Sequence, residues 1–344
     1  MLLTSDGPLT AAYDLAMLDL DGVVYIGSAA VDGASAAIAD ARSAGMRVAF
    51  ITNNASRPAG VVAKHLRELG VTAAAEDVVT SAQAAARLLL ERFGAGAPIL
   101  CLGGAGLRAA LDEVGLVPVD AGAEAAAAAS GYGPDLPWRD IMHAAVRIRD
   151  GLPWVASNTD HTIPTAYGVA PGHGVLVDMM RRFTGVTPQV AGKPERPLLD
   201  ETVRRVGGRR PLMVGDRLDT DIEGAHRAGV DSLLVLTGVS GLAELVRASP
   251  GERPTYVAPD LRGLGVPHAA PEAVPGGWRL GGWTGRVEEG RLVLRDDGPG
   301  DGPTPSSADW WRVAAATAWD HRDRTGVVPD VTMARVPEPG RAAR

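Results

Sequence analysis

Short apolar segments alternate with longer helical segments along most of this chain, and this alternation constrains the fold more than any other feature. The first apolar segment spans residues 15–18, and an Ala-rich helical segment follows at 33–44. A second apolar segment spans 47–51, and residues 58–69 again favour a helix. This order is typical of a parallel sheet with helices on its faces. We therefore expect an α/β protein with a doubly wound, Rossmann-like parallel sheet.

The alternation restarts further along the chain, which indicates a second α/β domain inserted into the first. Helices are predicted at 81–93, 107–114, 138–149 and 174–184, and strands at 99–102, 125–129 and 153–157. Helices at 198–206 and 222–228 and strands at 211–214 and 232–236 then return to the first sheet. We expect the core domain at 1–81 and 186–262, the inserted cap domain at 82–185, and a small C-terminal module at 263–344.

The predicted C-terminal module differs in composition from the rest of the chain. Pro and Gly are dense there, as in residues 298–303, where we expect a mobile loop. Five of the seven Trp residues lie beyond residue 277: Trp278, Trp283, Trp310, Trp311 and Trp319. Large rings of this kind favour a small core over a binding face.

Charge and hydropathy exclude several functions. The net charge is -7 and no block of Lys or Arg occurs, so we expect no nucleic-acid partner. No apolar run is long enough to span a membrane, and the N-terminal residues lack the features of a signal peptide. We therefore expect a cytoplasmic protein that is not bound to a membrane. The single cysteine, Cys101, lies in an apolar run and is expected to be a buried, inert thiol. The sequence does not set the oligomeric state, and a homodimer is kept as an expectation.

Two acids follow the first predicted strand directly. Asp19 and Asp21 are two residues apart, so an extended chain directs both carboxylates to one side, and Gly22 permits the turn that follows. The carboxyl ends of parallel strands form the edge at which ligands bind. One aspartate there can attack as a nucleophile while the other transfers protons.

Three further polar groups occupy equivalent positions. Thr52, Asn53 and Asn54 end the second predicted strand and offer a hydroxyl and amide donors for phosphate oxygens. Lys193 supplies one cation in a loop before a helix. Asp216, Asp219 and Asp221 follow a later strand and suit a hard cation that prefers oxygen ligands. Spacing alone does not decide between Asp219 and Asp221.

Together and in this order, the four groups resemble the four motifs of the haloacid dehalogenase superfamily of phosphohydrolases. The segments 19–23 and 51–57, the size of the insertion, and its segments 156–160 and 171–174 resemble the p-nitrophenyl phosphatase and phosphoglycolate phosphatase subfamily. Within it, actinobacterial glycerol 3-phosphate phosphatases are the most similar group. The resemblance covers roughly residues 10–262 and is weaker in the C-terminal module.

The resemblance implies a role for each matched residue and implies Mg²⁺ as cofactor. Asp19 would be the nucleophile and a metal ligand, and Asp21 the general acid/base that binds the metal through its backbone carbonyl. Lys193 would neutralise charge on Asp19 and on the phosphoryl oxygens. Thr52 and Asn53, with Asn54 beside them, would bind the phosphoryl group. Asp216 would bind the metal directly, and Asp221 would bind it directly or through water. Because a phosphate dianion repels a carboxylate nucleophile, such cations are needed.

Two other classes of function share some of these features. A phosphorylatable receiver-like signalling protein also combines acids, a Thr and a Lys on a parallel sheet, but Asp21 and the insertion argue against it. Gly103, Gly104 and Gly106 follow a strand as in dinucleotide-binding proteins, but the full glycine spacing is absent. His161 and His173 are interpreted as solvated loop residues.

The candidate substrate-selecting loops of the insertion are 130–134 and 158–167. They include Asn158 and Asp160, and they contain no Arg or Lys. A second anionic group on the substrate would therefore lack a partner unless Arg217 reaches it. The expected partner is a small phosphate ester, with a short polyol phosphate such as glycerol 3-phosphate favoured over phosphoglycolate, pyridoxal phosphate, a sugar phosphate or a nucleoside monophosphate.

Overall fold

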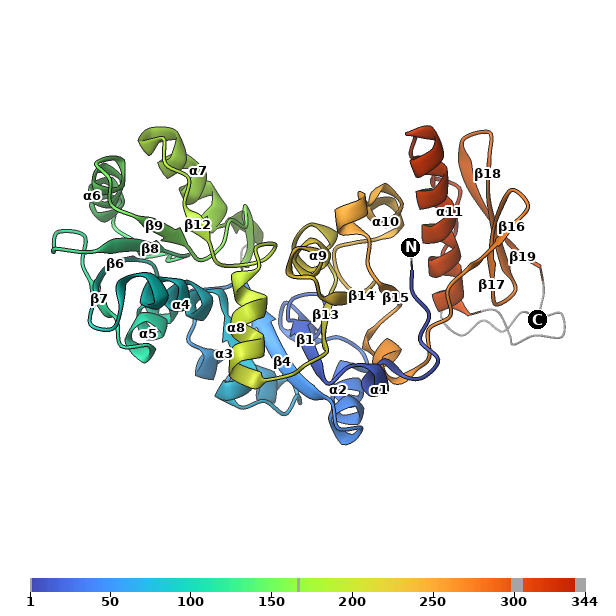
Figure 1. Cartoon of the computed structure of the whole chain (residues 1–344), viewed down its shortest axis with the longest axis horizontal. Helices are drawn as coiled ribbons and strands as arrows, with labels where there is room; N and C mark the ends of the chain where they lie inside the picture. The colour runs from blue at the N-terminus through green and yellow to red at the C-terminus, as the bar shows by residue number, and fades with distance from the viewer. Residues whose placement is uncertain (1, 166–167, 298–305, 338–344) are drawn as a thin grey trace. The chain divides into compact units, whose positions relative to one another are not determined.

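The computed structural model describes residues 2–165, 168–297 and 306–337. The chain divides into two compact units, one of residues 1–48 with 209–344 and one of residues 49–208. Each unit is described by itself below (Figure 1). Within the described ranges, no helix is both long and apolar enough to cross a membrane.

The first unit contains parallel strands in the order β15-β14-β13-β1. Their bounds are β1 (Leu15–Asp19), β13 (Pro211–Gly215), β14 (Asp231–Val235) and β15 (Tyr256–Ala258). In the pairing register, Leu18 lies opposite Val214, and Gly215 lies opposite Leu234. The strands are buried along nearly their whole length, as expected for a sheet covered on both faces. The strands predicted at 15–18, 211–214 and 232–236 are confirmed.

Short helices connect these strands. They are α1 (Leu9–Ala12), α2 (Ala34–Ser43), the π-helical turn η2 (Leu218–Ile222), α9 (Glu223–Ala228), α10 (Leu242–Arg247) and the 3₁₀ turns η3 (Pro250–Glu252) and η4 (Leu261–Gly265). A small hairpin of β2 (Tyr25–Ile26) and β3 (Ala29–Ala30) follows the first strand. The helix predicted at 222–228 is present, but η2 precedes it and brings Asp221 into a helical turn. Gly229, at a φ of 70°, ends α9 with a left-handed residue.

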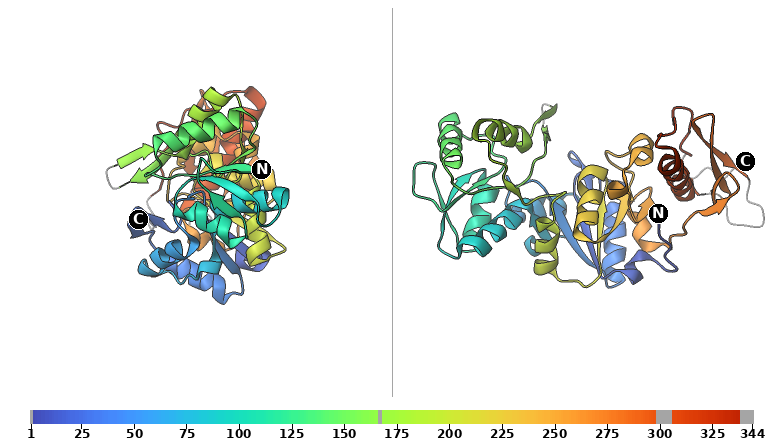
Figure 2. Two further views of the ribbon diagram at one scale, coloured as in Figure 1. Left: turned by 90° about the vertical axis from the view of Figure 1, so that its left-hand side faces the viewer. Right: turned by 45° about the horizontal axis from the view of Figure 1, so that its top comes forward.

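The C-terminal module is an antiparallel sheet with one long helix beside it (Figures 1 and 2). Its elements are β16 (Glu272–Val274), β17 (Gly277–Leu280), β18 (Trp283–Glu288), β19 (Arg291–Asp296) and α11 (Ser307–Thr325). Three of the five Trp residues of the module, Trp310, Trp311 and Trp319, are buried on α11. The expected core of large rings is therefore confirmed for this helix. The loop predicted at 298–303 lies outside the described residues.

The second unit contains two parallel core strands and three core helices. They are β4 (Arg47–Thr52), which begins in the first unit, β5 (Val78–Thr80), α3 (Ala59–Glu68), α4 (Ser81–Phe93) and α8 (Pro197–Val206), with the 3₁₀ turn η1 (Ala75–Asp77). Thr52 lies opposite Thr80 in the register. The Thr80 hydroxyl accepts from the amide of Gln83 while the Gln83 side chain accepts from the amide of Thr80, so a capping box starts α4 at the predicted residue.

The cap domain is built on a parallel sheet of order β12-β9-β8-β6-β7. Its elements are β6 (Pro98–Leu102), α5 (Ala105–Glu113), β7 (Val117–Val119), β8 (Ala127–Ser130), α6 (Trp138–Arg149), β9 (Trp154–Ala156), β10 (Thr162–Thr165), β11 (Gly168–Pro171), α7 (His173–Thr184) and β12 (Gln189–Val190). In Figure 1, α6 and α7 cover one face of this sheet and α4 and α5 the other. The Ala-rich segment is a central strand because all its side chains are buried between neighbours, which outweighs its weak strand propensity.

The expected fold class is confirmed: a doubly wound parallel-sheet core, an inserted α/β cap and a C-terminal module. The sequence did not reveal the antiparallel pair of β10, which lies inside the loop predicted at 158–167, and β11, which follows that loop. Tyr167 of that loop lies outside the described residues. The predicted domain bounds stay a prediction.

Candidate active site

Three strand ends of the first unit meet at one edge of its sheet. Asp19 ends β1, Asp216 follows β13, and the loop Thr237–Gly241 begins just after β14. Because β13 pairs in parallel with both neighbours, these three chain segments leave the sheet at the same side. The sheet register thus brings together acids that are almost two hundred positions apart in the sequence.

The acids at this edge form a compact cluster. One carboxylate oxygen from each of Asp19, Asp216 and Asp221 lies within 4.8 Å of the others. Asp216 and Asp221 are fully buried, and Asp19 is half-buried. Two buried carboxylates with a half-buried one beside them concentrate negative charge in a region of low dielectric, which is costly without a cation.

Backbone amides fix the orientation of two of these acids. Asp216 Oδ2 accepts a hydrogen bond of 2.6 Å from the amide of Val239, and the Asp216 carbonyl accepts from the amide of Ser240 at 3.1 Å. Asp221 Oδ2 accepts from the amides of Asp216 and Arg217 at 3.2 and 3.1 Å. Each carboxylate therefore presents its other oxygen in a fixed direction.

Two glycines allow the backbone to approach the carboxylates closely. A Cβ atom on Gly238 would lie 1.9 Å from Asp216 Oδ2, and one on Gly215 would lie 2.2 Å from Asp221 Oδ2. Real Cβ atoms do not approach other atoms so closely. Any side chain at these two positions would displace the acids.

The choice that the sequence left open between Asp219 and Asp221 is decided by geometry. Asp221 belongs to the buried cluster, whereas Asp219 is exposed and forms a bidentate ion pair with Arg217 at 2.7 and 3.0 Å. Partial burial raises the pKa of Asp219, but the Arg217 guanidinium outweighs this and holds that pKa below its ordinary value. The Arg217 guanidinium is therefore already paired with a carboxylate of this chain.

Asp21 lies outside the cluster and is exposed. The turn after it depends on Gly22, which has a φ of 85° and donates its amide to the carbonyl of Tyr25 at 2.8 Å. The Gly22 carbonyl accepts from the Thr237 hydroxyl at 2.5 Å. The loop Thr237–Gly241 therefore contacts both the turn that carries Asp21 and the carboxylate of Asp216.

In the second unit, Asn53 is the centre of a hydrogen-bond network. Its side-chain oxygen accepts from the amide of Lys193 at 2.8 Å, and its side-chain nitrogen donates to the Lys193 carbonyl at 3.0 Å and to Asp160 Oδ1 at 3.1 Å. Its backbone carbonyl accepts from the side chains of Asn158 at 2.7 Å and Ser81 at 2.5 Å. Asn53, Asn158 and Asp160 thus fix the loop that carries Lys193.

The other predicted phosphate ligands lie in the same unit. Thr52 is buried at the end of β4, and its hydroxyl accepts from the amide of Asn54 at 3.1 Å. The Asn54 side chain accepts from the amide and the hydroxyl of Ser56 at 2.8 and 2.7 Å. Lys193 is only 2% exposed. The structure therefore groups Thr52, Asn53 and Lys193 at one end of β4.

The two cap histidines differ from each other. His161 is exposed and lies 2.8 Å from an Asp178 oxygen, as a loop residue would. His173 is buried, and its Nδ1 donates to the carbonyl of Asn158 at 2.8 Å. Burial lowers the pKa of His173 to about 4. The interpretation of His173 as solvated was wrong, because α7 begins at this residue and turns its first side chain inward.

The glycines at 103–106 have a packing reason. A Cβ on Gly106 would lie 2.5 Å from the carbonyl oxygen of Ala55, and the Gly106 amide donates to the Ser56 carbonyl at 2.9 Å. Close approach of the segment 55–57 therefore explains the glycine there. Burial also raises the pKa of the Cys101 thiol to about 11, as expected for an unreactive cysteine.

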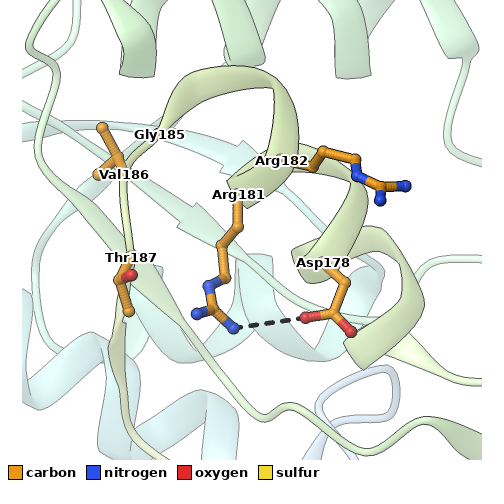
Figure 3. A pocket seen from close by; sticks show the side chains of 6 residues that line it. All are labelled: Asp178, Arg181, Arg182, Gly185, Val186 and Thr187. Atoms are coloured by element: carbon orange, nitrogen blue, oxygen red, sulfur yellow. Dashed lines mark hydrogen bonds and ion pairs between the residues drawn. The ribbon is translucent and has the colours of Figure 1, made fainter.

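Two surface hollows lie away from these groups. One of about 370 Å³ lies on the cap beside the end of α7, where Arg181 pairs with Asp178 at 3.4 Å (Figure 3). Another of about 220 Å³ lies in the first unit, between the C-terminal module and residues near the N-terminus. Neither is lined by the acids of the cluster.

The loop Thr237–Gly241 is the functional element that sequence reasoning missed. It follows a correctly predicted strand, so its position at the ligand edge could have been inferred. It contains no acid or base, however, and acts through backbone amides and hydroxyls, which leave little signal in residue type.

The acid cluster fits a divalent metal ion of the Mg²⁺ type. Its donors are carboxylate oxygens, which are the ligands that hard cations prefer. Their spacing within 4.8 Å allows one ion to contact all three, and burial excludes the water that would otherwise screen their charges. Asp19, Asp216 and Asp221 are the residues that would hold it.

A buried acid cluster at the carboxyl edge of a capped parallel sheet defines a class of α/β hydrolases that transfer phosphoryl groups. A family model described as haloacid dehalogenase-like hydrolase matches residues 16–117, and one described as HAD-hydrolase-like matches residues 190–264. The chain is 47% identical to a D-glycerol 3-phosphate phosphatase from Mycobacterium tuberculosis over 253 residues, which are 73% of this chain and 71% of the relative.

Two further comparisons agree with these matches. An acid sugar phosphatase from Staphylococcus aureus is 34% identical, over 72% of this chain and 95% of the relative. A solved structure of a glycerol phosphate phosphatase from Mycobacterium tuberculosis in complex with magnesium has a TM-score of 0.81 at 40% identity, covering 91% of this chain and 92% of that one. The chain belongs to the haloacid dehalogenase-like hydrolase family and is a phosphatase.

Proposed function

We propose that this phosphatase hydrolyses a small polyol phosphate, with glycerol 3-phosphate preferred, through a phosphorylated Asp19 and with Mg²⁺ as cofactor. The observation that carries the proposal is the buried cluster of Asp19, Asp216 and Asp221 at the ligand edge of the sheet. When bound, Mg²⁺ would offset the repulsion between the phosphate and the attacking carboxylate.

The proposed reaction has two steps. A carboxylate oxygen of Asp19 attacks phosphorus, the bond from phosphorus to the substrate oxygen breaks, and Asp21 gives its proton to the departing alkoxide. Water then attacks the phosphorus of the acyl phosphate while Asp21 takes up a proton from it, which releases inorganic phosphate and restores Asp19. The exposure of Asp21 suits an acid/base group that must reach both substrate and water.

The residues of the second unit are proposed to bind the phosphoryl group. The Lys193 ammonium would neutralise its oxygens, and the Thr52 hydroxyl and the Asn53 backbone amide, with Asn54 beside them, would donate hydrogen bonds. Asn53 has a further proposed role, because its side chain binds both backbone groups of Lys193.

Substrate choice is proposed to follow from the cap loops and from Arg217. The described parts of the loops 130–134 and 158–167 contain no Arg or Lys, and the Arg217 guanidinium pairs with Asp219. A neutral leaving group with hydroxyls suits these loops, which carry Asn158 and Asp160 and no cation, better than a second anion. Two similar proteins, the D-glycerol 3-phosphate phosphatase and the glycerol phosphate phosphatase solved with magnesium, also support a glycerol phosphate.

The test compares kcat/KM for glycerol 3-phosphate, a sugar phosphate, phosphoglycolate, pyridoxal phosphate and a nucleoside monophosphate in Mg²⁺. We expect glycerol 3-phosphate to be best. If kcat/KM for a sugar phosphate is more than tenfold higher, a difference of about 1.4 kcal/mol at the transition state, the proposed polyol substrate is wrong and a sugar phosphate takes its place.

Asp19→Asn should abolish turnover with the fold intact, and an active variant would overturn the covalent mechanism.

We also propose that the enzyme forms a homodimer through α6. Trp138, Met142 and Val146 are spaced four residues apart on this helix and are 60%, 51% and 37% exposed. Sedimentation should show a dimer that Trp138→Glu converts to a monomer, whereas a wild-type monomer would exclude this assembly.

The cytoplasmic location stays a prediction, to be checked by cell fractionation.

A further inference from the structure

The loop Thr237–Gly241 binds the acid cluster from outside the recognised motifs. Val239 donates to the Asp216 carboxylate at 2.6 Å, and Ser240 donates its amide to the Asp216 carbonyl at 3.1 Å. The Ser240 hydroxyl also accepts from the amide of Leu218, the first residue of η2, at 3.3 Å. The position of this loop therefore sets the orientation of Asp216 and the start of the turn that carries Asp221.

The loop leads directly into α10, a helix of only six residues that starts at Leu242. A helix this short is not stable by itself, so its position depends on tertiary contacts. Those contacts come largely from α11. The Trp319 indole donates to the carbonyl of Leu245 at 2.7 Å, and the Arg322 guanidinium donates to the carbonyl of Arg247 at 2.5 Å. Both acceptors lie in the last turn of α10, where carbonyls lack the regular helical partner; the Leu245 carbonyl also accepts from the amide of Ala248 at 3.3 Å.

A shared hydrophobic core joins the same elements. Leu218 and Ile222 of η2 and Leu245 and Val246 of α10 belong to one buried cluster with the Trp residues of α11. The buried Trp residues of α11 thus share their core with the segment that carries Asp221. Displacing α11 would expose residues on both sides of that core.

We propose that α11 is a positioning element for the metal site, and that Trp319 maintains metal affinity by holding α10 and, through it, the loop Thr237–Gly241. This inference rests on the proposed function, because it takes Asp216 to be a metal ligand. The effect passes through the backbone: the indole fixes the end of α10, α10 fixes the loop, and the loop amides orient Asp216.

The decisive variant is Trp319→Phe in the full chain, which keeps an aromatic ring but removes the N–H donor. Its matched control is Trp283→Phe, because the Trp283 indole donates to the Ser306 carbonyl at 3.0 Å in the same module and contacts neither α10 nor the loop by a hydrogen bond. Mg²⁺ binding is measured by calorimetry without substrate, and the Mg²⁺ concentration for half-maximal hydrolysis of p-nitrophenyl phosphate is measured in parallel.

We expect Trp319→Phe to weaken Mg²⁺ binding about fivefold, somewhat less than the roughly tenfold or greater loss typical of groups that contact a metal ligand directly. Its kcat at saturating Mg²⁺ should stay within about twofold of the wild type, because a purely positioning effect is removed by excess metal. Unchanged affinity in Trp319→Phe, or an equal loss in Trp283→Phe, would overturn the proposal.

Two further variants keep the test interpretable. Arg322→Gln removes the second bond to α10 from an exposed side chain, so it reports on the same effect if Trp319→Phe does not fold, and we expect about a twofold loss of Mg²⁺ affinity. Asp216→Asn tests the underlying assignment. If Asp216→Asn still binds Mg²⁺, the proposed metal site is wrong; if it does not bind Mg²⁺ and both α11 variants do so normally, only the role of α11 is wrong.

Discussion

The cap domain and the C-terminal module are both additions to the hydrolase core, but they bury their apolar side chains differently. The core cluster beneath α6 and α7 of the cap contains only residues between Leu100 and Val186, which are mostly small or aliphatic. The C-terminal module instead packs its Trp residues into a cluster that includes Leu218, Ile222 and Leu245 of the hydrolase core. We therefore expect a change in this cap cluster to leave the acid cluster unaffected, and a change in the shared cluster to reach it.

The largest expected effect is the loss of Trp310, which is 1% exposed in the shared core. Trp310→Ala should lower the free energy of unfolding by about 3–5 kcal/mol, because it removes a large buried side chain and leaves a cavity. We also expect weaker Mg²⁺ binding, measured by calorimetry below the melting temperature. If stability falls and Mg²⁺ affinity does not, the two regions are less tightly coupled than their shared core indicates.

The matching change in the cap is Ile148→Ala, at a residue that is 1% exposed on α6. It should cost about 2–4 kcal/mol. Because the core cluster that contains Ile148 includes no residue of the first unit, the loss should be confined to faster amide exchange in cap elements, with Mg²⁺ affinity unchanged. Faster exchange in α11 would contradict the comparison.

Acid pH offers a third test, since each region contains a buried neutral histidine. Burial lowers the pKa of His268 to about 4, and the nearby Arg312 guanidinium, which donates to His268 Nδ1 at 3.0 Å, lowers it further. The folded pKa lies below the unfolded value of about 6.5, so the stabilising contribution is complete above about pH 6.5 and is lost as pH falls towards 4.

That contribution is at most about 3 kcal/mol. His268→Gln should reduce acid-induced amide exchange in α11, and His173→Gln should do so in α7. Hydrogen-exchange mass spectrometry between pH 7 and pH 4 separates the two regions. If both variants changed amide exchange in α11 and α7 to the same extent, protonation of each histidine would not destabilise only its own region.

The smallest expected effect concerns helix capping. The Ser306 hydroxyl accepts from the amide of Asp309 at 3.1 Å and caps α11, whereas α6 and α7 have no side-chain cap. Ser306→Ala should cost about 1 kcal/mol, seen as a lower urea midpoint. Introducing a Ser cap on α7 by Gly172→Ser should not raise stability by a similar amount, because a Cβ there would lie 2.3 Å from the Asp160 carbonyl oxygen. A stabilised Gly172→Ser variant would show that this backbone can move.

Much of the core could be predicted because its signals are local. The strands ending at Asp19 and Gly215, and the helices at 81–93 and 138–149, follow from apolar patterning and from nearby Gly and Pro residues. The candidate acids were found for the same reason, since each directly follows such a strand. The strands β10 and β11 were missed because their residues do not alternate between apolar and polar, and β11 is mostly exposed.

The sequence by itself therefore determined the alternation of strands and helices and the chemical character of the ligand edge. Only the tertiary structure decided that Asp221, and not Asp219, joins Asp19 and Asp216, because the choice depends on the π-helical turn and on which acid Arg217 pairs with. It also decided that Asn53 binds the backbone of Lys193 and that α11 contacts α10. Those contacts join residues 74 to 140 positions apart, and no local pattern records which partner a buried donor finds.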